Sequence, residues 1–356
     1  MAPVVKALMK QPEIETIVCS TGQHREMLKP ILDLFKISCD HDLDVMVPGQ
    51  DLNALFSRTL FRTGELLSKV GADRLLVHGD TTTAGAAALA AFHQKLPVGH
   101  VEAGLRTRRL HEPWPEELNR RLVDIVADHL YAPTEESARN LEAEALGKKT
   151  IVVTGNTVID ALLQVNEQLT SNSSLIAVLE QKFGFLDRSK KLLLITGHRR
   201  ENFGQAFENI CRAIAEIGRR GDTQIVYPVH LNPNVREPVF RIIGNCENIS
   251  LIEPVGYLEF VYLMRLATLI LTDSGGVQEE APSLGKRVLV MRNITERPEA
   301  VAAGLVEIVG TEHDRIVDRV SDYLDGRSSI SLDGAVNPYG DGHAAERIVH
   351  QLNSEY

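Results

Sequence analysis

Hydrophobic and polar positions along the chain follow two alternating patterns. Short runs of β-branched and aliphatic residues, which are typical of strands, recur at residues 16–20, 74–78, 97–101, 150–153, 191–196, 224–228 and 268–272. Segments between them, such as residues 115–128 and 207–217, repeat their apolar positions with the 3.6-residue period of a helix. This alternation predicts an α/β fold with parallel sheets that are covered by helices on both faces.

The length of the chain predicts two domains. Its 356 residues exceed what one ordinary hydrophobic core serves. The sequence turns polar near residues 165–188, before a new strand begins at Lys191. We therefore expect a first Rossmann-like domain at residues 1–165 and a second one at residues 166–339. A turn at residues 337–342 then leads into a C-terminal helix within residues 340–356, which we expect to complete the first domain.

Composition limits the partners of the protein. The net charge is −10 and aromatic residues make up only 5% of the chain, which argues against nucleic-acid binding. No apolar run reaches membrane-spanning length and no signal peptide is visible, so we expect a cytoplasmic protein without a membrane partner. The four cysteines have neither CxxC nor metal-ligand spacing, and we expect buried thiols in a reducing compartment.

Two predicted strands end in carboxylates. Asp80 follows the strand at residues 74–78, and Glu102 follows the strand at residues 97–101. Ligands in open α/β sheets bind beyond the carboxyl ends of strands, and two close carboxylates can form an acid/base pair. The alternatives are that Asp80 caps the next helix and that Glu102 forms a loop salt bridge with Arg106.

Two further segments carry candidate charges. Glu116 and Glu117 open the helix that follows Pro115, where acids also compensate the helix dipole. His198 and Arg199 follow the first strand of the second domain, where such groups suit a diphosphate. A solvated charge cluster is the alternative for this second segment.

The most specific motif spans residues 272–282, where a strand runs into Ser274-Gly275-Gly276 and a helix begins. Backbone N–H groups in such a turn can hold phosphate at the positive end of the helix. Glu280, one turn into the helix, can accept both hydroxyls of a ribose. Arg297 is either a contact in the same cleft or a surface charge, and Phe260 either stacks on a base or belongs to the core.

Two other motifs are rejected. Residues 340–345 fit a loose GxGxxG/A pattern, but they follow a proline turn and leave too little chain for a βαβ unit. His111-Glu112 begins like a zinc-binding helix, but Pro113 and Pro115 interrupt it and no second histidine has the required spacing. We expect neither a nicotinamide cofactor nor a metal.

Taken together, these motifs resemble the non-hydrolysing UDP-N-acetylglucosamine 2-epimerases over essentially the whole chain. The blocks that carry the resemblance are HGDTTT (78–83), HVEAGLRT (100–107), WPEE-NR (114–120), GNTVIDAL (155–162), GHRREN (197–202), YPVHLNPNV (227–235), DSGGVQEEAPSLGK (273–286), TERPE (295–299) and NPYGDG (337–342). So many co-linear blocks make a chance similarity very improbable.

The resemblance implies a fold and a reaction. The fold is a pair of Rossmann-like domains that face each other across a cleft, as in GT-B-like glycosyltransferases, and the active site lies in that cleft. The reaction interconverts UDP-N-acetylglucosamine and UDP-N-acetylmannosamine by elimination to UDP and 2-acetamidoglucal, followed by re-addition. The resemblance also implies a homodimer, no cofactor, and a supply of activated N-acetylmannosamine for cell-surface polysaccharides.

Residue roles follow from the matching positions. Asp80, Glu102 and Glu116 would serve proton transfer at C2 and leaving-group assistance, with the identity of the C2 base left open. His198 would contact the diphosphate. The remaining substrate contacts would be Arg120, Arg199, Phe260, Ser274, Gly275, Gly276, Glu280 and Arg297.

The sequence departs from the family pattern at two places, and each departure leads to a prediction. Family members have a strand and a loop reading GTRPEAIK before the segment MAPVVKAL, so we expect a first strand to be missing and a gap in a parallel sheet. Gln23, Glu26 and Arg58 resemble parts of a second, activating UDP-N-acetylglucosamine site. Activated relatives have glutamine at the position of Glu26, and we therefore expect weak or absent activation.

Three other functions compete with this hypothesis. A UDP-sugar glycosyltransferase of the same architecture would need an acceptor groove, for which the sequence offers no motif. A hydrolysing epimerase would use the same carboxylates but release free N-acetylmannosamine. A UDP-sugar-binding protein without turnover would bind UDP and exchange no proton.

Overall fold

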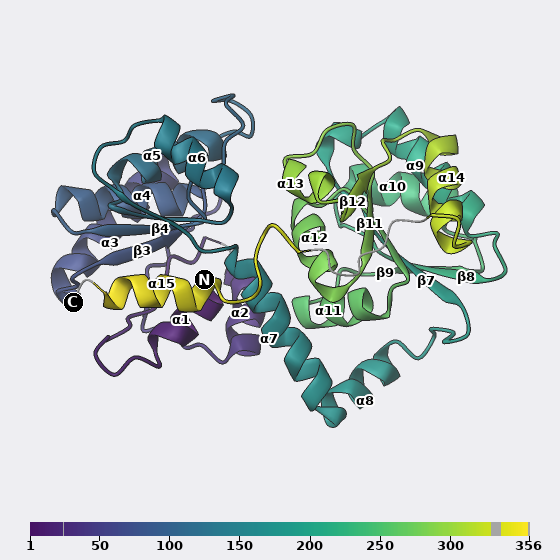
Figure 1. Cartoon of the computed structure of the whole chain (residues 1–356), viewed down its shortest axis with the longest axis horizontal. Helices are drawn as coiled ribbons and strands as arrows, with labels where there is room; N and C mark the ends of the chain where they lie inside the picture. The colour runs from purple at the N-terminus through teal and green to yellow at the C-terminus, as the bar shows by residue number, and fades with distance from the viewer. Residues whose placement is uncertain (24, 329–335, 355–356) are drawn as a thin grey trace. The chain divides into compact units, whose positions relative to one another are not determined.

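In the computed structural model, which describes residues 1–23, 25–328 and 336–354, the chain divides into two compact units (Figure 1). Unit 1 consists of Met1–Ala161 and Tyr339–Tyr356, and unit 2 consists of Leu162–Pro338. The expected division falls after residue 165, within helix α7 (Thr157–Ser171), and near residue 340. Residues 355 and 356 of the expected C-terminal segment lie outside the described part of the chain.

The strands of unit 1 are all parallel. β3 (Leu75–His78), β4 (Val98–Val101), β5 (His129–Ala132) and β6 (Thr150–Val153) form one sheet in that order. β1 (Cys19–Ser20) and β2 (His41–Asp42) form a separate two-stranded sheet. The strand expected at residues 16–20 is shorter than predicted, because only Cys19 and Ser20 have ladder partners. In the described residues, unit 1 therefore contains two parallel sheets rather than one.

Helices cover both faces of the four-stranded sheet (Figure 1). α3 (Leu52–Val70), α4 (Thr82–His93), α5 (Glu116–Val126) and α6 (Glu135–Ala143) contribute to the core on one face. α1 (Ala2–Leu8) and α15 (Ala344–Asn353) pack together on the other. Leu130 and Tyr131, adjacent on β5, point into the two different cores, as the two-residue period of a strand requires. α2 (Arg25–Phe35) precedes β2.

Unit 2 is built on one six-stranded parallel sheet in the order β12-β11-β10-β7-β8-β9. The strands are β7 (Lys191–Thr196), β8 (Thr223–Pro228), β9 (Ile249–Ile252), β10 (Leu269–Thr272), β11 (Arg287–Val290) and β12 (Val306–Ile308). The helices are the C-terminal part of α7, then α8 (Ser173–Lys182), α9 (Gln205–Ile217), α10 (Pro233–Ile243), α11 (Tyr257–Leu266), α12 (Gly275–Glu280), α13 (Pro298–Ala302) and α14 (His313–Leu324). Residues 192–195 of β7 are all buried, which confirms the prediction of a doubly covered strand.

The observed sheets and helices confirm the α/β class with parallel strands. The strands predicted at residues 150–153 and 191–196 have the observed bounds. The expectation of buried thiols is confirmed only for Cys211. It is wrong for Cys19, which is exposed on the short sheet β1–β2, and for Cys39 and Cys246, which are partly exposed.

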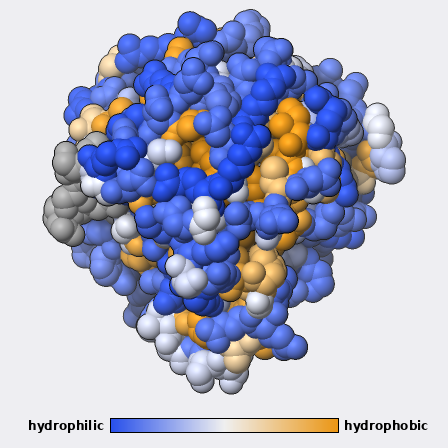
Figure 2. All heavy atoms as spheres, turned by 90° about the vertical axis from the view of Figure 1, so that its right-hand side faces the viewer, coloured by the Kyte–Doolittle hydropathy of each residue, from blue (hydrophilic) through white to orange (hydrophobic). Residues whose placement is uncertain are grey.

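The surface is mainly hydrophilic on the face drawn in Figure 2, where apolar side chains form separate patches between polar ones. None of the helices in the described residues combines the length and the apolar character that a membrane crossing requires.

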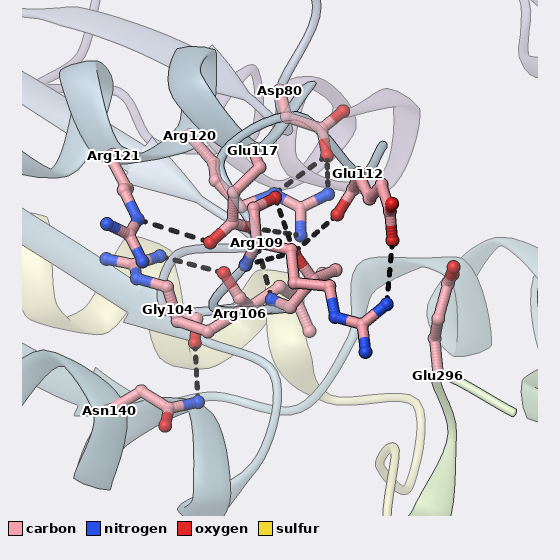
Figure 3. Close-up of polar contacts among 12 residues, drawn as sticks. Asp80, Gly104, Arg106, Arg109, Glu112, Glu117, Arg120, Arg121, Asn140 and Glu296 are labelled. Carbon is pink, nitrogen blue, oxygen red and sulfur yellow. Dashed lines mark hydrogen bonds and ion pairs between the residues drawn. The ribbon is translucent and has the colours of Figure 1, made fainter. Parts of the chain in front are cut away.

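The turn after β4 depends on Gly104. Its φ is +85°, and a Cβ at this position would lie 2.2 Å from the carbonyl oxygen of Ser137 and 2.9 Å from Cδ1 of Leu141. The side-chain amide of Asn140 donates to the Gly104 carbonyl oxygen at 3.1 Å (Figure 3). Any other residue would therefore push the turn away from α6, together with Glu102 two positions earlier.

We predict that Gly104→Ala destabilises the protein more than Gly71→Ala does. Gly71 ends α3 with a φ of +64°, and a methyl group added there would have no neighbour within 4 Å, so alanine costs about 1–2 kcal/mol for its left-handed backbone alone. The clash at Gly104 should add roughly 1–3 kcal/mol. Urea denaturation of both variants measures the difference, and equal losses would contradict the close packing against Ser137.

Candidate active site

The first group of candidate residues lies in unit 1, beyond the carboxyl end of β3. His78 ends the strand, Gly79 follows with a φ of +67°, and Asp80 completes the turn before α4. The hydroxyl of Thr81 accepts the N–H of Ala84 and caps α4. The capping role that was the alternative for Asp80 therefore belongs to Thr81, and the Asp80 carboxylate is available for other contacts.

Arg120 holds the Asp80 carboxylate from α5 (Figure 3). Its Nε donates to Asp80 Oδ2 at 3.1 Å, and its Nη2 donates to the same oxygen. Nη1 of Arg120 lies 3.2 Å from Oε2 of Glu117, which is fully buried and also accepts from the backbone N–H of Thr107 at 3.1 Å. Nε of Arg121 donates to the other Glu117 oxygen at 3.2 Å. Arg120 thus fixes the direction of Asp80 because Glu117 fixes Arg120.

Glu102 lies next to this turn, at the carboxyl end of the neighbouring strand β4. Its oxygen Oε2 would lie 3.1 Å from a Cβ on Gly79, and its Oε1 accepts from the amide of Asn156 at 3.3 Å. Its φ is +69°, a left-handed conformation that a glutamate adopts only when its surroundings impose it. The structure thus brings Glu102 and the turn that carries Asp80 together.

Two neighbours of Glu102 clarify its electrostatics. Nε2 of His78 lies 3.7 Å from Glu102 Oε2, and burial holds the pKa of His78 well below its usual value, with His100 acting in the same direction. His78 is therefore neutral at pH 7. Arg106, the alternative partner of Glu102, forms ion pairs with Asp124 and Glu144, at 2.7 and 2.6 Å.

Glu116 differs from the other candidates in unit 1. It is the first residue of α5 and is half-buried. Among the described side chains it has neither a hydrogen bond nor an ion pair with Asp80 or Glu102. The neighbouring acid, Glu117, carries the ion pairs of this helix start instead. Glu116 therefore lies at a helix N-terminus, where its negative charge is favourable without an ion-pair partner.

The second group of candidates surrounds a cavity of about 280 Å³ in unit 2. The cavity lies beyond the carboxyl ends of β7, β8 and β10. Its lining is Thr196, Gly197, His198, Pro228, His230, Pro254, Val255, Tyr257, Phe260, Ser274, Val277 and Glu280. Phe260 is half-buried on α11 and faces the cavity, which favours its interpretation as a ligand contact over a core residue.

Asp273 organises the loop that carries His198. This fully buried carboxylate accepts the backbone N–H groups of His198 and Arg199, each at 2.9 Å, and the amide of Asn202 at 3.3 Å. The His198 ring stacks on the ring of His230 with centroids 5.3 Å apart. Burial lowers the pKa of His198 despite the attraction of Asp273, and Arg199 and His230 lower it further. His198 is therefore a neutral hydrogen-bonding group near pH 7.

Two guanidinium groups flank the start of α12. A Cβ on Gly275 would lie 3.6 Å from Nη2 of Arg199 and 3.8 Å from Cζ of Arg297, so both arginines approach the Ser274-Gly275-Gly276 turn. Arg297 is oriented by an ion pair with Glu279. The first N–H groups of a helix have no partner within the helix, and together with two arginines they form a site suited to an anion.

Glu280 lies one turn further along, at the inner wall of the cavity. Burial, with a smaller effect from Glu279, raises the pKa of its carboxyl to about 7, although the hydroxyl of Tyr257, which donates to Oε1, acts in the opposite direction. The carboxylate therefore ionises near neutral pH and can accept hydroxyl groups of a ligand.

Three residues, Gln23, Glu26 and Arg58, are expected to form an activating site. The side chain of Gln23 accepts a hydrogen bond from the hydroxyl of Thr83, which lies at the start of α4, three residues after Asp80. Arg58, on α3, donates to the backbone oxygen of Val45 at 2.9 Å. Glu26 is exposed on α2. The hypothesis of a second site stays a prediction.

Several groups that shape these two sites give little signal in the sequence. Asp273 and His230 lie within the motifs quoted above, but nothing in those motifs points to their roles. Tyr257 gives no signal, because it meets Glu280 only through the fold. Glu117 has the pattern of a dipole-compensating acid, whereas it is the buried partner of Arg120. Among the described residues, no group of three or more His, Cys, Asp or Glu side chains is arranged to hold a metal ion.

Comparison with known proteins assigns the chain to a family. The family model described as UDP-N-acetylglucosamine 2-epimerase matches residues 6–353. The UDP-N-acetylglucosamine 2-epimerase of Escherichia coli strain K12 is 55% identical over 356 residues, which cover 99% of this chain and 95% of that protein.

Two solved structures extend the likeness to the fold. The UDP-GlcNAc 2-epimerase of Neisseria meningitidis, bound to UDP-GlcNAc, has a TM-score of 0.90 and 47% identity, and the match covers 99% of this chain and 96% of that one. The Methanocaldococcus jannaschii UDP-GlcNAc 2-epimerase, in complex with UDP-GlcNAc and UDP, has a TM-score of 0.82 and 33% identity over 99% of this chain and 95% of that one. These likenesses confirm two Rossmann-like domains, and the chain belongs to the UDP-N-acetylglucosamine 2-epimerase family, whose members are isomerases.

Proposed function

We propose that this protein reversibly epimerises UDP-N-acetylglucosamine at C2 to UDP-N-acetylmannosamine without releasing free sugar. The observation that carries the proposal is the pair of carboxylates at adjacent strand ends, Asp80 and Glu102, in a family whose solved relatives bind UDP-GlcNAc. The anion-binding turn at Ser274 and the ionisable Glu280 supply the matching nucleotide contacts.

The proposed reaction runs through elimination and re-addition. A carboxylate takes the proton from C2 while the bond between C1 and the diphosphate oxygen breaks, and its electrons leave with UDP. A C1–C2 double bond remains in 2-acetamidoglucal. In the return step, C2 receives a proton on the opposite face and a UDP oxygen bonds to C1, so that atoms and charges balance.

The two units would divide this work. In unit 1, Asp80 is paired with Arg120 and directed by it, whereas Glu102 lies beside a neutral histidine and an amide. Two carboxylates with such different partners are suited to opposite proton-transfer roles. Glu116, with no ion-pair partner among the described residues, is the third candidate for leaving-group assistance.

In unit 2, the departing diphosphate would be stabilised at the start of α12. Arg199, Arg297 and His198 supply donors to the developing charge, with the helix N–H groups beside them. Phe260 would stack on the uracil, and Glu280 would accept the ribose hydroxyls. The negative charge of UDP makes such donors the main source of leaving-group stabilisation.

We extend the proposal to a cytoplasmic homodimer whose product supplies cell-surface polysaccharide synthesis. The adjacent helices α3, α4 and α5 expose Phe61, Phe92 and Ile125, with exposed fractions of 64%, 56% and 60%. Large exposed apolar side chains favour association. Sedimentation analysis of the free protein should give twice the mass of one chain, and a monomer at all concentrations would contradict this part.

We predict C2 exchange with solvent when UDP-N-acetylglucosamine is incubated with the protein in deuterium oxide. The C2 proton is lost to a carboxylate and replaced from solvent, so proton NMR should show UDP-N-acetylmannosamine that carries deuterium at C2. Free N-acetylmannosamine would instead indicate the hydrolysing reaction, and UDP binding without exchange would indicate a binding protein.

Asp80→Asn supplies the matched control for this experiment. It keeps the size of the side chain but removes a carboxylate that would transfer a proton, so exchange should fall by at least roughly 10²-fold, the lower range of acid–base catalysis. UDP affinity, which depends on unit 2, should stay within about twofold. An Asp80→Asn variant with full exchange would remove this residue from the mechanism.

We predict that UDP-N-acetylglucosamine binds more tightly as the pH rises through about 7, the value to which burial raises the pKa of Glu280. Only the ionised carboxylate accepts two ribose hydroxyls. One pH unit below the pKa, about a tenth of it is ionised and binding should be up to roughly tenfold weaker. Calorimetry at several pH values measures the effect. UDP-N-acetylglucosamine is used instead of UDP because it has no terminal phosphate that would itself titrate in this pH range.

Two variants distinguish Glu280 from His198 as the cause of this pH dependence of affinity. Glu280→Gln should bind weakly and lose the rise in affinity. Tyr257→Phe removes the hydroxyl that lowers the pKa of Glu280, so the midpoint should move to higher pH. The same pH dependence in Glu280→Gln and in the unmodified protein would exclude the carboxylate as its cause.

A further inference from the structure

A chain of four charged or ionisable side chains lies beneath the Asp80 turn. His100, on β4, is completely buried, and its Nδ1 lies 2.6 Å from Oδ1 of Asp124 on α5. The other oxygen of Asp124 lies 2.7 Å from Nη2 of Arg106. Arg106 in turn donates to both oxygens of Glu144 at 2.6 and 2.8 Å. None of these four residues was needed for the proposed reaction.

The remaining ring nitrogen of His100 faces the main chain. Its Nε2 lies 2.9 Å from the carbonyl oxygen of Gly79, the residue that directly precedes Asp80. A carbonyl oxygen has no proton to donate, so this contact is a hydrogen bond only if Nε2 carries the proton. At Nδ1 the partner is a carboxyl group, so the protonation of Nδ1 depends on whether Asp124 is ionised.

Asp124 is the ionised partner in this contact. Although the carboxyl is buried, its second oxygen lies 2.7 Å from Arg106, and this ion pair lowers the pKa of Asp124 and favours the ionised form. An ionised carboxylate only accepts hydrogen bonds, so Nδ1 of His100 must also be protonated. Both ring nitrogens then carry protons, and the ring is an imidazolium.

The charges of the group support this protonation state. With His100 as a cation, the two positive groups, His100 and Arg106, balance the two negative groups, Asp124 and Glu144. With a neutral His100, a net negative charge would remain among side chains of which three are nearly or fully buried. A buried charge without a partner is strongly unfavourable.

The position of the Gly79 carbonyl determines the position of Asp80. Gly79 donates its N–H to the oxygen of Val101 at 3.0 Å, and the Asp80 carbonyl accepts from the amide of Asn119 at 2.9 Å. The hydrogen bond from His100 fixes the peptide group between these two anchors. Hydrogen bonds from a charged donor are stronger than those from a neutral one.

We propose that His100 is a positioning residue that, as a buried imidazolium paired with Asp124, holds the Gly79 carbonyl and thereby sets the direction of the Asp80 carboxylate. This inference rests on the proposed role of Asp80 in the epimerisation. His100 itself touches no reacting atom, because it is enclosed between β4, α5 and the Gly79 turn.

Two substitutions separate the two hydrogen bonds of His100. In His100→Asn the amide reaches the position of Nδ1, so it keeps the contact with Asp124 and loses Gly79. In His100→Gln the amide reaches the position of Nε2, so it keeps Gly79 and loses Asp124. Both lose one buried hydrogen bond, and thermal denaturation should show similar losses of stability.

We expect His100→Asn to lower kcat by roughly 10–100-fold with little change in KM, because a displaced catalytic group affects the chemical step more than binding. His100→Gln should retain several times more activity than His100→Asn. The control is His129→Asn, the same change at a buried histidine on the neighbouring strand β5, which should leave kcat unchanged. Equal kcat in His100→Asn and the unmodified protein, or in the two His100 variants, would overturn the proposal.

Nitrogen NMR of the unmodified protein with isotopically labelled histidine tests the charge state even if the variants fail to fold. The His100 signals should show a proton on both ring nitrogens, and a single protonated nitrogen would overturn the proposal. The proposed function fails separately, if the unmodified protein exchanges no proton at C2 of UDP-N-acetylglucosamine.

Discussion

A carboxylate that is buried away from water must be paired with donors, and three such carboxylates organise the candidate sites of this protein. Glu117 and Asp124 in unit 1 and Asp273 in unit 2 are fully buried. Each satisfies this requirement by binding groups that belong to a functional loop. Glu117 holds Arg120, Asp124 holds His100 and Arg106, and Asp273 holds the backbone of His198 and Arg199. The cost of leaving any of these acids unpaired keeps the loops in place.

The two units use this constraint in different ways. In unit 1 the buried acids orient cations that in turn direct the carboxylate of Asp80 and fix its turn, which suits proton transfer. In unit 2 the buried acid orients main-chain N–H groups. The cavity is lined by the neutral His198 and by Glu280, which ionises near pH 7, and two arginines approach the turn at Ser274. Such a set of groups suits a diphosphate and a ribose. In the proposed function, the chemistry and the binding of the nucleotide therefore have separate structural supports.

Much of the fold could be predicted from the sequence because parallel strands that are buried on both faces are continuous and apolar. The bounds of β6 and β7 followed from this pattern alone. The strand at residues 16–20 was overestimated because pairing, and not local composition, decides where β1 begins. The candidate residues were also visible, since polar groups directly after apolar strands stand out. Their partners were not, because Arg120, Asp124 and Tyr257 meet Asp80, His100 and Glu280 across 40, 24 and 23 positions of the chain, and only the fold brings them together.

The central claim is that the bond between C1 and the diphosphate oxygen breaks and forms again during turnover. It is tested most directly with UDP-N-acetylglucosamine that carries a heavy oxygen isotope in this bridging position. If UDP leaves C1, its terminal phosphate can rotate before it returns, and phosphorus NMR of the recovered substrate should show the isotope in non-bridging positions of the β-phosphate. If the isotope stays in the bridge while UDP-N-acetylmannosamine accumulates, the C1–O bond is never broken, and the elimination mechanism is contradicted.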